Sequence, residues 1–257
     1  MKREIMIVAG AVLFLFALLA AWQLVAGMRL ISPVFFPVPL RIGEALYRQF
    51  STGMVWTPLA MTTGRMLLGW SLAMLVGVTL GAVIGLSRTA ADYLEGPLEF
   101  LRTMPASAVL PIFIMVMGLT NEMIVAVIAF GSLWPILLGS LYGFQNVEPR
   151  LLEVSRTLGF RAFSILLKVR LPNAVPDILS GARVGIGFAL ILSVVAEMLS
   201  STPGLGNNVL LASRSFRSAD LFAGIALLGI LGAVSTGAIA LLEQRLLRWR
   251  RDQATSI

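Results

Sequence analysis

Six long apolar runs constrain this chain more than any other feature of its sequence. They cover residues 5–27, 66–86, 97–119, 123–142, 182–199 and 221–242. An α-helix needs about 20 residues to cross roughly 30 Å of hydrocarbon, and each run is close to that length. Of the 257 residues, 58% are apolar and only 13% are charged, too few to cover a water-soluble domain. We therefore predict an all-α, polytopic membrane protein with six transmembrane helices.

Proline interrupts the third and fourth runs. Glu99 and Arg102 lie in the first turns of the third run, followed by Pro105 and Pro111, and Pro135 lies inside the fourth. A proline removes a backbone donor and either begins or kinks a helix. We expect Pro105 to mark a helix start and Pro135 to mark a kink, both along a transport pathway.

Lysine and arginine are unevenly distributed between the segments that join the runs. With the N-terminus inside, fourteen of the 20 basic residues lie on the cytoplasmic side and six outside, namely Arg29, Arg41, Arg48, Arg65, Arg214 and Arg217. Because basic segments stay in the cytoplasm, this split predicts six spans with both termini inside. The net charge of +7 then reflects topology and contact with anionic lipid, and we expect no nucleic-acid partner.

Histidine and cysteine are both absent from the sequence. Their absence excludes a disulfide framework, a thiolate nucleophile and an imidazole base. The two lysines, Lys2 and Lys168, follow no glycine-rich run, so the chain has no phosphate-binding loop. We expect no enzymatic activity, no metal and no cofactor, and any ATP chemistry must lie on another chain.

Small residues recur every four positions along two of the runs. The second run carries Gly69, Ala73, Gly77, Gly81 and Gly85, and the last run carries Gly229, Ala233 and Gly237. In lipid, such a ridge allows the backbone of another helix to approach closely. Both helices are therefore expected to pack tightly inside the bundle.

An external segment, 28–63, follows the first run and contains four prolines. Within it, residues 40–50 place Ile42, Leu46 and Phe50 four apart, which predicts a short helix lying on a surface. We therefore treat residues 1–60, the first span with this segment, apart from residues 61–257, which hold the other five spans.

The polar segment EVSRTLGFRAFSILLKVRLP, residues 153–172, separates two apolar runs. Residues 151–158 can form two helical turns that end at Gly159 in a left-handed conformation. A second helix over 161–169 would place Phe163 on an apolar face before Pro172 stops it. Such a pair suits a groove on a soluble partner, and the alternative is a helix resting on anionic lipid.

This segment resembles the EAA loop of bacterial ABC-importer permeases. The six-residue step from Glu153 to Gly159 and the terminal Leu171-Pro172 match, whereas Val154 and Ser155 replace the two alanines. The resemblance implies a cytoplasmic coupling loop, 145–181, that docks on an ATPase subunit. The residues that it assigns to this contact are Glu153, Ser155, Gly159, Phe163, Leu171 and Pro172.

Three further motifs are similar to those of the nitrate/sulfonate/taurine/bicarbonate group of these permeases. They are Phe36-Pro37-Val38-Pro39, Arg102-Thr103-Met104-Pro105 before Pro111, and Ala196-Glu197 with Gly204-Leu205-Gly206. The first motif is equally explained as a stiff external turn. The group implies a type I importer fold, in which the first helix (residues 1–60) is peripheral and residues 61–257 form the core. It also implies a second permease copy forming a homodimer, an ATPase dimer, a soluble binding protein and a place in the bacterial inner membrane.

Glu197 is the one carboxylate near the interior of a confident span. It continues the small-residue ridge of Gly181, Gly185, Ala189 and Ser193, so it faces protein or the pathway. An ionisable group at this depth indicates function. We expect Glu197 and Ser193 to organise a gate, Glu197 as a hydrogen-bond acceptor. A substrate contact and contact with interfacial water are the alternatives.

Arg214 and Arg217 are three apart in the segment between the last two runs, and would share one face if that segment is helical. We expect them to contact an acidic binding protein. Anchoring at lipid head groups explains them equally well.

Three function classes fit these patterns. The preferred class is the permease subunit of an ATP-driven importer for a small anionic solute such as a sulfonate, taurine or nitrate; a thiamine or pyrimidine precursor is the alternative substrate. A stand-alone secondary transporter would need more intramembrane ionisable groups or an inverted repeat. An integral-membrane enzyme would need histidine, cysteine or paired carboxylates within the membrane.

Overall fold

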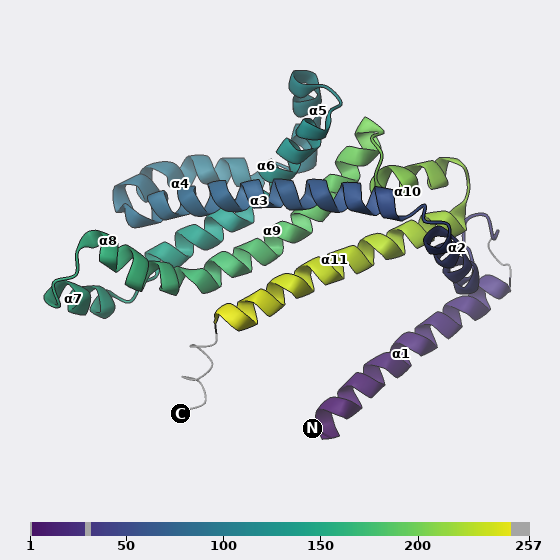
Figure 1. Ribbon diagram of the computed structural model, residues 1–257, viewed down its shortest axis with the longest axis horizontal. Coiled ribbons are helices and arrows are strands. Elements are labelled where there is room, and N and C mark those ends of the chain that lie inside the picture. The colour runs from purple at the N-terminus through teal and green to yellow at the C-terminus, as the bar shows by residue number, and fades with distance from the viewer. Residues whose placement is uncertain (1, 29–31, 248–257) are drawn as a thin grey trace.

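A computed structural model of the chain describes residues 2–28 and 32–247 (Figure 1). Within that part every regular element is helical: α1 Lys2–Gly27, α2 Pro39–Ser51, α3 Trp56–Leu86, α4 Arg88–Thr103, α5 Ala106–Met117, α6 Asn121–Gln145, α7 Pro149–Thr157, α8 Ala162–Ile165, a π turn over Leu166–Arg170, α9 Leu171–Ser200, α10 Leu205–Arg214 and α11 Ser218–Leu246. Arg29, Arg248, Arg250 and Arg251, counted in the charge analysis, lie outside the described residues.

Five helices are long and apolar enough to cross a membrane: α1, α3, α6, α9 and α11. The predicted third span, 97–119, is bent, because α4 and α5 meet at an angle of 87°. Met104 precedes Pro105 and is held extended (ψ 124°), which breaks the helix. Pro105 then begins α5 as its N-cap, in agreement with the predicted helix start. The bent pair supplies a sixth span if it crosses as one unit.

The packed centre of the bundle is a parallel pair, α3 and α6. A Cβ built on Gly69 would lie 2.5 Å from Ile128, one on Gly77 2.9 Å from Ile136, and one on Gly81 2.5 Å from Ser140. The predicted close packing of this ridge is therefore confirmed. The corresponding prediction for α11 is wrong within the described chain, because Gly229 and Gly237 face open space.

Helix α9 packs antiparallel on α6. Gly139 approaches the backbone of Asp177 and Gly181, and Gly143 approaches Ala174. The buried side chains of α3, α5, α6 and α9 form one apolar cluster that includes Met66, Leu110 and Ile128. A rigid three-helix centre thus holds the ends of α3, α6 and α9 in register.

The helix α1 diverges from the bundle (Figure 1). It remains attached near its C-terminal end, where the Trp22 ring lies 5.6 Å from Phe36 and 5.8 Å from Phe222. The amphipathic helix predicted around residues 40–50 is present as α2, which buries Ile42 and Ala45 against Ala223 of α11. The molecule therefore has two ends: one carries α7 and α8, and the other carries α2 and α10.

Candidate functional site

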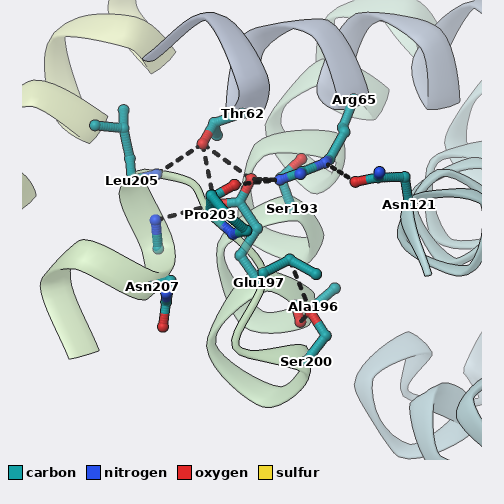
Figure 2. Close-up of polar contacts among 12 residues, drawn as sticks. Thr62, Arg65, Asn121, Ser193, Ala196, Glu197, Ser200, Pro203, Leu205 and Asn207 are labelled. Atoms are coloured by element: carbon teal, nitrogen blue, oxygen red, sulfur yellow. Dashed lines mark hydrogen bonds and ion pairs between the residues drawn. The ribbon is translucent and has the colours of Figure 1, made fainter. Parts of the chain in front are cut away.

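Glu197 lies in the last turn of α9 and is fully buried, with 0% of its surface exposed. Its Oε1 accepts a hydrogen bond from Arg65 Nη1 at 2.9 Å, and its Oε2 accepts one from the Gly206 backbone N–H at 3.0 Å. The Thr62 hydroxyl donates to the same carboxylate, 2.9 Å from Oε1 and 3.0 Å from Oε2 (Figure 2). A carboxylate taken out of water needs such partners, because burying it unpaired costs several kcal/mol.

Arg65 connects this carboxylate to two further elements. Its Nη1 also donates to the Pro203 carbonyl at 2.8 Å, and its Nε donates to Asn121 Oδ1 at 2.9 Å, at the first residue of α6 (Figure 2). The arginine is almost fully buried as well. One guanidinium therefore joins α3, α6, α9 and the loop before α10.

Thr62 completes the arrangement as both donor and acceptor. While its hydroxyl donates to Glu197, its oxygen accepts the Leu205 N–H at 2.9 Å. The loop is thus held at Pro203, Leu205 and Gly206 by three separate hydrogen bonds. We call this set of contacts, made by Thr62, Arg65, Asn121, Glu197 and the backbone of 203–206, the clasp.

The two glycines of Gly204-Leu205-Gly206 are required by close approach. A Cβ on Gly204 would overlap the Glu197 carboxyl group, and a Cβ on Gly206 would lie 2.6 Å from the Val194 carbonyl. The motif therefore allows the loop backbone to lie directly on the end of α9. Ser201, in a left-handed conformation (φ 53°), ends α9 and turns the chain back into this loop.

The clasp can hold one end of the bundle in a single arrangement. It balances one buried positive charge with one negative charge and leaves each carboxylate oxygen bonded. A network in which every member is satisfied rigidifies and specifies structure, whereas a partly broken one is unstable. Movement of α3 against α9 at this end would have to break the clasp.

Sequence reasoning located Glu197 but missed its partners. Contact with interfacial water is not what the structure shows, because Glu197 is buried. Arg65 was counted among the external basic residues; it lies at the α10 end, but it is buried instead of exposed there. The available signal was the spacing of Thr62 and Arg65, which are three apart and so share a face of α3.

The other residues predicted for the gate are not part of the clasp. Ser193 is buried one turn before Glu197, but its hydroxyl donates back to the Ala189 carbonyl at 2.8 Å. Pro105 is exposed at the bend between α4 and α5. Pro135 lies within α6, where its carbonyl faces Gly181. Their role in a pathway stays a prediction.

The predicted coupling loop lies at the opposite end of the bundle. Its first helix is α7, and Gly159 follows it with φ +74°, the left-handed conformation that was expected. Phe163 of α8 is 69% exposed and Leu158 is 67% exposed, so the loop presents apolar side chains outward. Glu153 is exposed, whereas Ser155 is buried and donates to the Leu151 carbonyl at 2.6 Å.

The second helix of this loop differs from the prediction. Helix α8 spans only Ala162–Ile165, and a π turn over Leu166–Arg170 follows it. Pro172 does not stop the helix, because the π turn over Leu166–Arg170 runs directly into α9 and Pro172 lies just after that junction. The chain is therefore helical without a break from Ala162 to Ser200.

Arg214 and Arg217 do not share a helical face. Arg214 is the last residue of α10 and Arg217 precedes α11, and Phe216 between them has φ 53°. Both arginines are exposed at the α10 end, and Arg217 lies 3.6 Å from Asp220. The condition that they form one helical pair is not met.

Comparisons with known proteins agree with this architecture. The putative aliphatic sulfonates transport permease protein SsuC of Bacillus subtilis is 32% identical over 91% of this chain and 85% of its own length. The taurine transport system permease protein TauC of Escherichia coli is 30% identical over 98% of this chain and 92% of its own. Among solved structures, the MetNI methionine ABC transporter in an inward-facing conformation matches with a TM-score of 0.67 at 16% identity, over 76% of this chain and 97% of that one.

A family model describing the inner membrane component of binding-protein-dependent transport systems matches residues 73–248. That match covers α6, the coupling loop, the α9–α10 loop and α11, and therefore most of the candidate site. This chain is a member of the family of binding-protein-dependent transport system inner membrane components, and is a permease subunit of the ABC-transporter type.

Proposed function

We propose that this permease carries a small anion of the sulfonate or taurine type across the bacterial inner membrane, with the clasp as the organiser of its outer gate. The substrate class is supported by the likeness to sulfonate and taurine permeases, and the gate is supported by the position of the clasp. It lies at the end of the bundle opposite α7 and α8, so a gate and an energy-coupling contact can occupy opposite sides of one membrane (Figure 1).

The exposed apolar loop around Leu158 and Phe163 is the proposed contact for an ATPase subunit. Glu153 and Gly159 supply an exposed carboxylate and an obligatory turn, and Ser155, Leu171 and Pro172 support the loop from within. An ATPase dimer would act on two permease copies, one for each ATPase. In this orientation α7, α8 and both termini face the cytoplasm, and α2 and α10 face a soluble binding protein.

The contacts of Glu197 favour a role in the gate over direct contact with the substrate. Its two oxygens already accept bonds from Thr62, Arg65 and Gly206, and its negative charge would repel an anion. Release of the Pro203–Gly206 segment from this carboxylate would free α10 to move relative to α3 and α9.

The test is ATP-dependent uptake in proteoliposomes that contain the permease with its cognate ATPase and binding protein. Labelled taurine and a labelled alkanesulfonate are the probes. We expect accumulation that requires both ATP and the binding protein. Accumulation driven by a proton or sodium gradient without the ATPase would contradict the proposal in favour of a secondary transporter.

Orientation has an independent test, because the chain contains no cysteine. Single cysteines at Tyr47 and Phe163, both exposed, would report the two ends of the bundle. A membrane-impermeant maleimide added to intact spheroplasts should label Tyr47→Cys and not Phe163→Cys. The reverse pattern would contradict the assigned orientation.

A further inference from the structure

A cavity of about 710 Å³ opens at the α10 end of the molecule. Its walls come from α2, the segment before α3, α10 and α11, and the side chains that matter here are Arg48, Met54, Leu205, Asn208, Arg217 and Asp220. A smaller groove of about 320 Å³, which contains Arg41, shares Arg217 and Asp220 with it. The volume of the larger cavity is typical of a site that receives a ligand or a short segment of a partner.

The charges in these two hollows are unbalanced. Asp220 Oδ1 lies 2.7 Å from Arg48 Nη2, and its Oδ2 lies 3.6 Å from Arg217 Nη1. Three arginines against one aspartate give the lining residues a net charge of +2. The side chains of Arg48 and Arg217 are 59% and 60% exposed, whereas Asp220 is only 19% exposed. Both guanidinium groups therefore keep free donors that point to solvent, and a second carboxylate could use them.

Apolar side chains border the same opening. Met54, which lines the cavity, is 71% exposed, and Leu211 is exposed beside it. Phe216 lines the adjoining groove, is exposed, and packs edge-on against Phe35 at 6.2 Å between ring centroids. A small free anion needs only the charge, whereas this border adds apolar contact area of the kind found at protein interfaces.

The floor of the cavity belongs to the clasp. Leu205 lines the cavity and is itself buried, and its N–H donates to Thr62 Oγ1 at 2.9 Å. A segment seated in the cavity would therefore touch the residue that ties the α10 loop to α3. Leu205 thus connects the cavity to the gate, because it both lines the cavity and donates a hydrogen bond within the clasp.

We propose that this cavity is the socket for an acidic loop of the soluble binding protein, whose carboxylate binds Arg48 and Arg217 in competition with Asp220. The proposal rests on the proposed function, since it needs a binding protein as partner. It adds Arg48, the cavity and the competing role of Asp220 to the contact expected at Arg217.

If Asp220 competes with the partner's carboxylate for the two arginines, removing an arginine and removing Asp220 should change the affinity in opposite directions. In nanodiscs that hold the permease with its ATPase, binding of the cognate soluble binding protein is measured by biolayer interferometry. Arg48→Gln should weaken binding roughly three- to tenfold, and Asp220→Asn should strengthen it by a similar factor. If the Arg48–Asp220 pair served only to hold α2 on α11, both variants would loosen the same contact and weaken binding together.

Glu44→Gln is the matched control for Asp220→Asn. Glu44 is exposed on α2 but lines the groove toward α1 instead of the cavity. Glu44→Gln removes one negative charge from this end of the molecule, as Asp220→Asn does. The socket predicts an effect at Asp220 and little at Glu44. Equal effects would indicate general electrostatic attraction and would overturn the proposal.

Two further results distinguish the remaining explanations. If sodium sulfate displaces the binding protein far better than sodium chloride at equal ionic strength, the arginines form a free-anion site and the socket is wrong. If the binding protein does not bind the wild-type permease at all, the proposed function itself fails. Binding to wild type with same-direction changes in Arg48→Gln and Asp220→Asn would overturn the socket alone.

Discussion

The carboxyl group of Glu197 occupies the space in which a side chain at Gly204 would begin. The loop before α10 can therefore lie on the end of α9 only while residue 204 has no Cβ. The same carboxylate then accepts the Gly206 N–H at 3.0 Å, so steric fit and hydrogen bonding act on one loop.

Replacing Gly204 with alanine should displace this loop and break the clasp. Overpacking of a tight site typically costs about 1–3 kcal/mol, which should lower the unfolding temperature in detergent and reduce uptake several-fold. Gly187→Ala is the control, because Gly187 lies in the same helix as Glu197 with nothing near its Cβ position. Tryptophan fluorescence on heating measures both, and equal unfolding temperatures for the two variants would contradict the assigned fit.

The Arg65–Glu197 pair should separate stability from function. Removing one partner leaves a buried charge unpaired, which typically costs about 3–5 kcal/mol, whereas replacing both with apolar residues is often close to neutral. We expect Arg65→Met and Glu197→Leu to lower the unfolding temperature more than the double variant does. The double variant should still fail to transport, because its loop is no longer held. Normal uptake by a stable double variant would show that the ion pair has no role in the gate.

The coupling loop should require Gly159 because of its left-handed backbone conformation, and not because glycine is small. Its φ of +74° suits glycine, is tolerated by asparagine and strains a β-branched residue, and a Cβ there would meet no atom within 4 Å. Gly159→Val should abolish ATPase co-purification or uncouple hydrolysis from uptake, while Gly159→Asn should retain both. Loss in both variants alike would point to a lost contact surface instead of a lost turn.

The α3–α6 contact should tolerate no added side chain. A Cβ on Gly81 would lie 2.5 Å from Ser140 and 2.8 Å from the Leu137 carbonyl, and backbone cannot move aside as a flexible side chain can. Gly81→Val should therefore reduce the amount of folded protein in the membrane. Gly43→Ala in α2, where the Cβ position is open, should leave that amount unchanged. Size-exclusion profiles of the extracted proteins give the comparison.

The fold was largely predictable because hydrophobic length and glycine spacing are local properties of the sequence. The ridge of α3 is a four-residue repeat, and the structure places Gly69, Gly77 and Gly81 against α6 as that repeat indicates. The helix start at Pro105 was predicted, but the bend was not, because a proline indicates where a helix begins and not the angle that it makes with the helix before it. Pro172 was misread as a helix stop, whereas the helical conformation continues through it by way of the π turn over Leu166–Arg170.

The site was less predictable because its members are far apart in the sequence. Thr62 and Glu197 are separated by 135 residues, and no local pattern reports that they meet. Arg65 looked external because it lies just before an apolar run, whereas the helix begins nine residues earlier at Trp56. Only the packing of α3 beside α9 shows that the buried charges of Arg65 and Glu197 pair with each other.

The role of the clasp in the gate is tested most directly with the Glu197→Gln variant. The number of solute molecules taken up per ATP hydrolysed is measured in proteoliposomes that also contain the ATPase and the binding protein. Glutamine keeps the size of the side chain but removes the charge that holds Arg65, Thr62 and Gly206 together, and hydrogen bonds to a charged group contribute about 1.5–3 kcal/mol each. We expect the variant still to reach the membrane and to hydrolyse ATP, with a fall in uptake per ATP of roughly tenfold or more. An unchanged ratio would contradict the role of the clasp as the organiser of the gate.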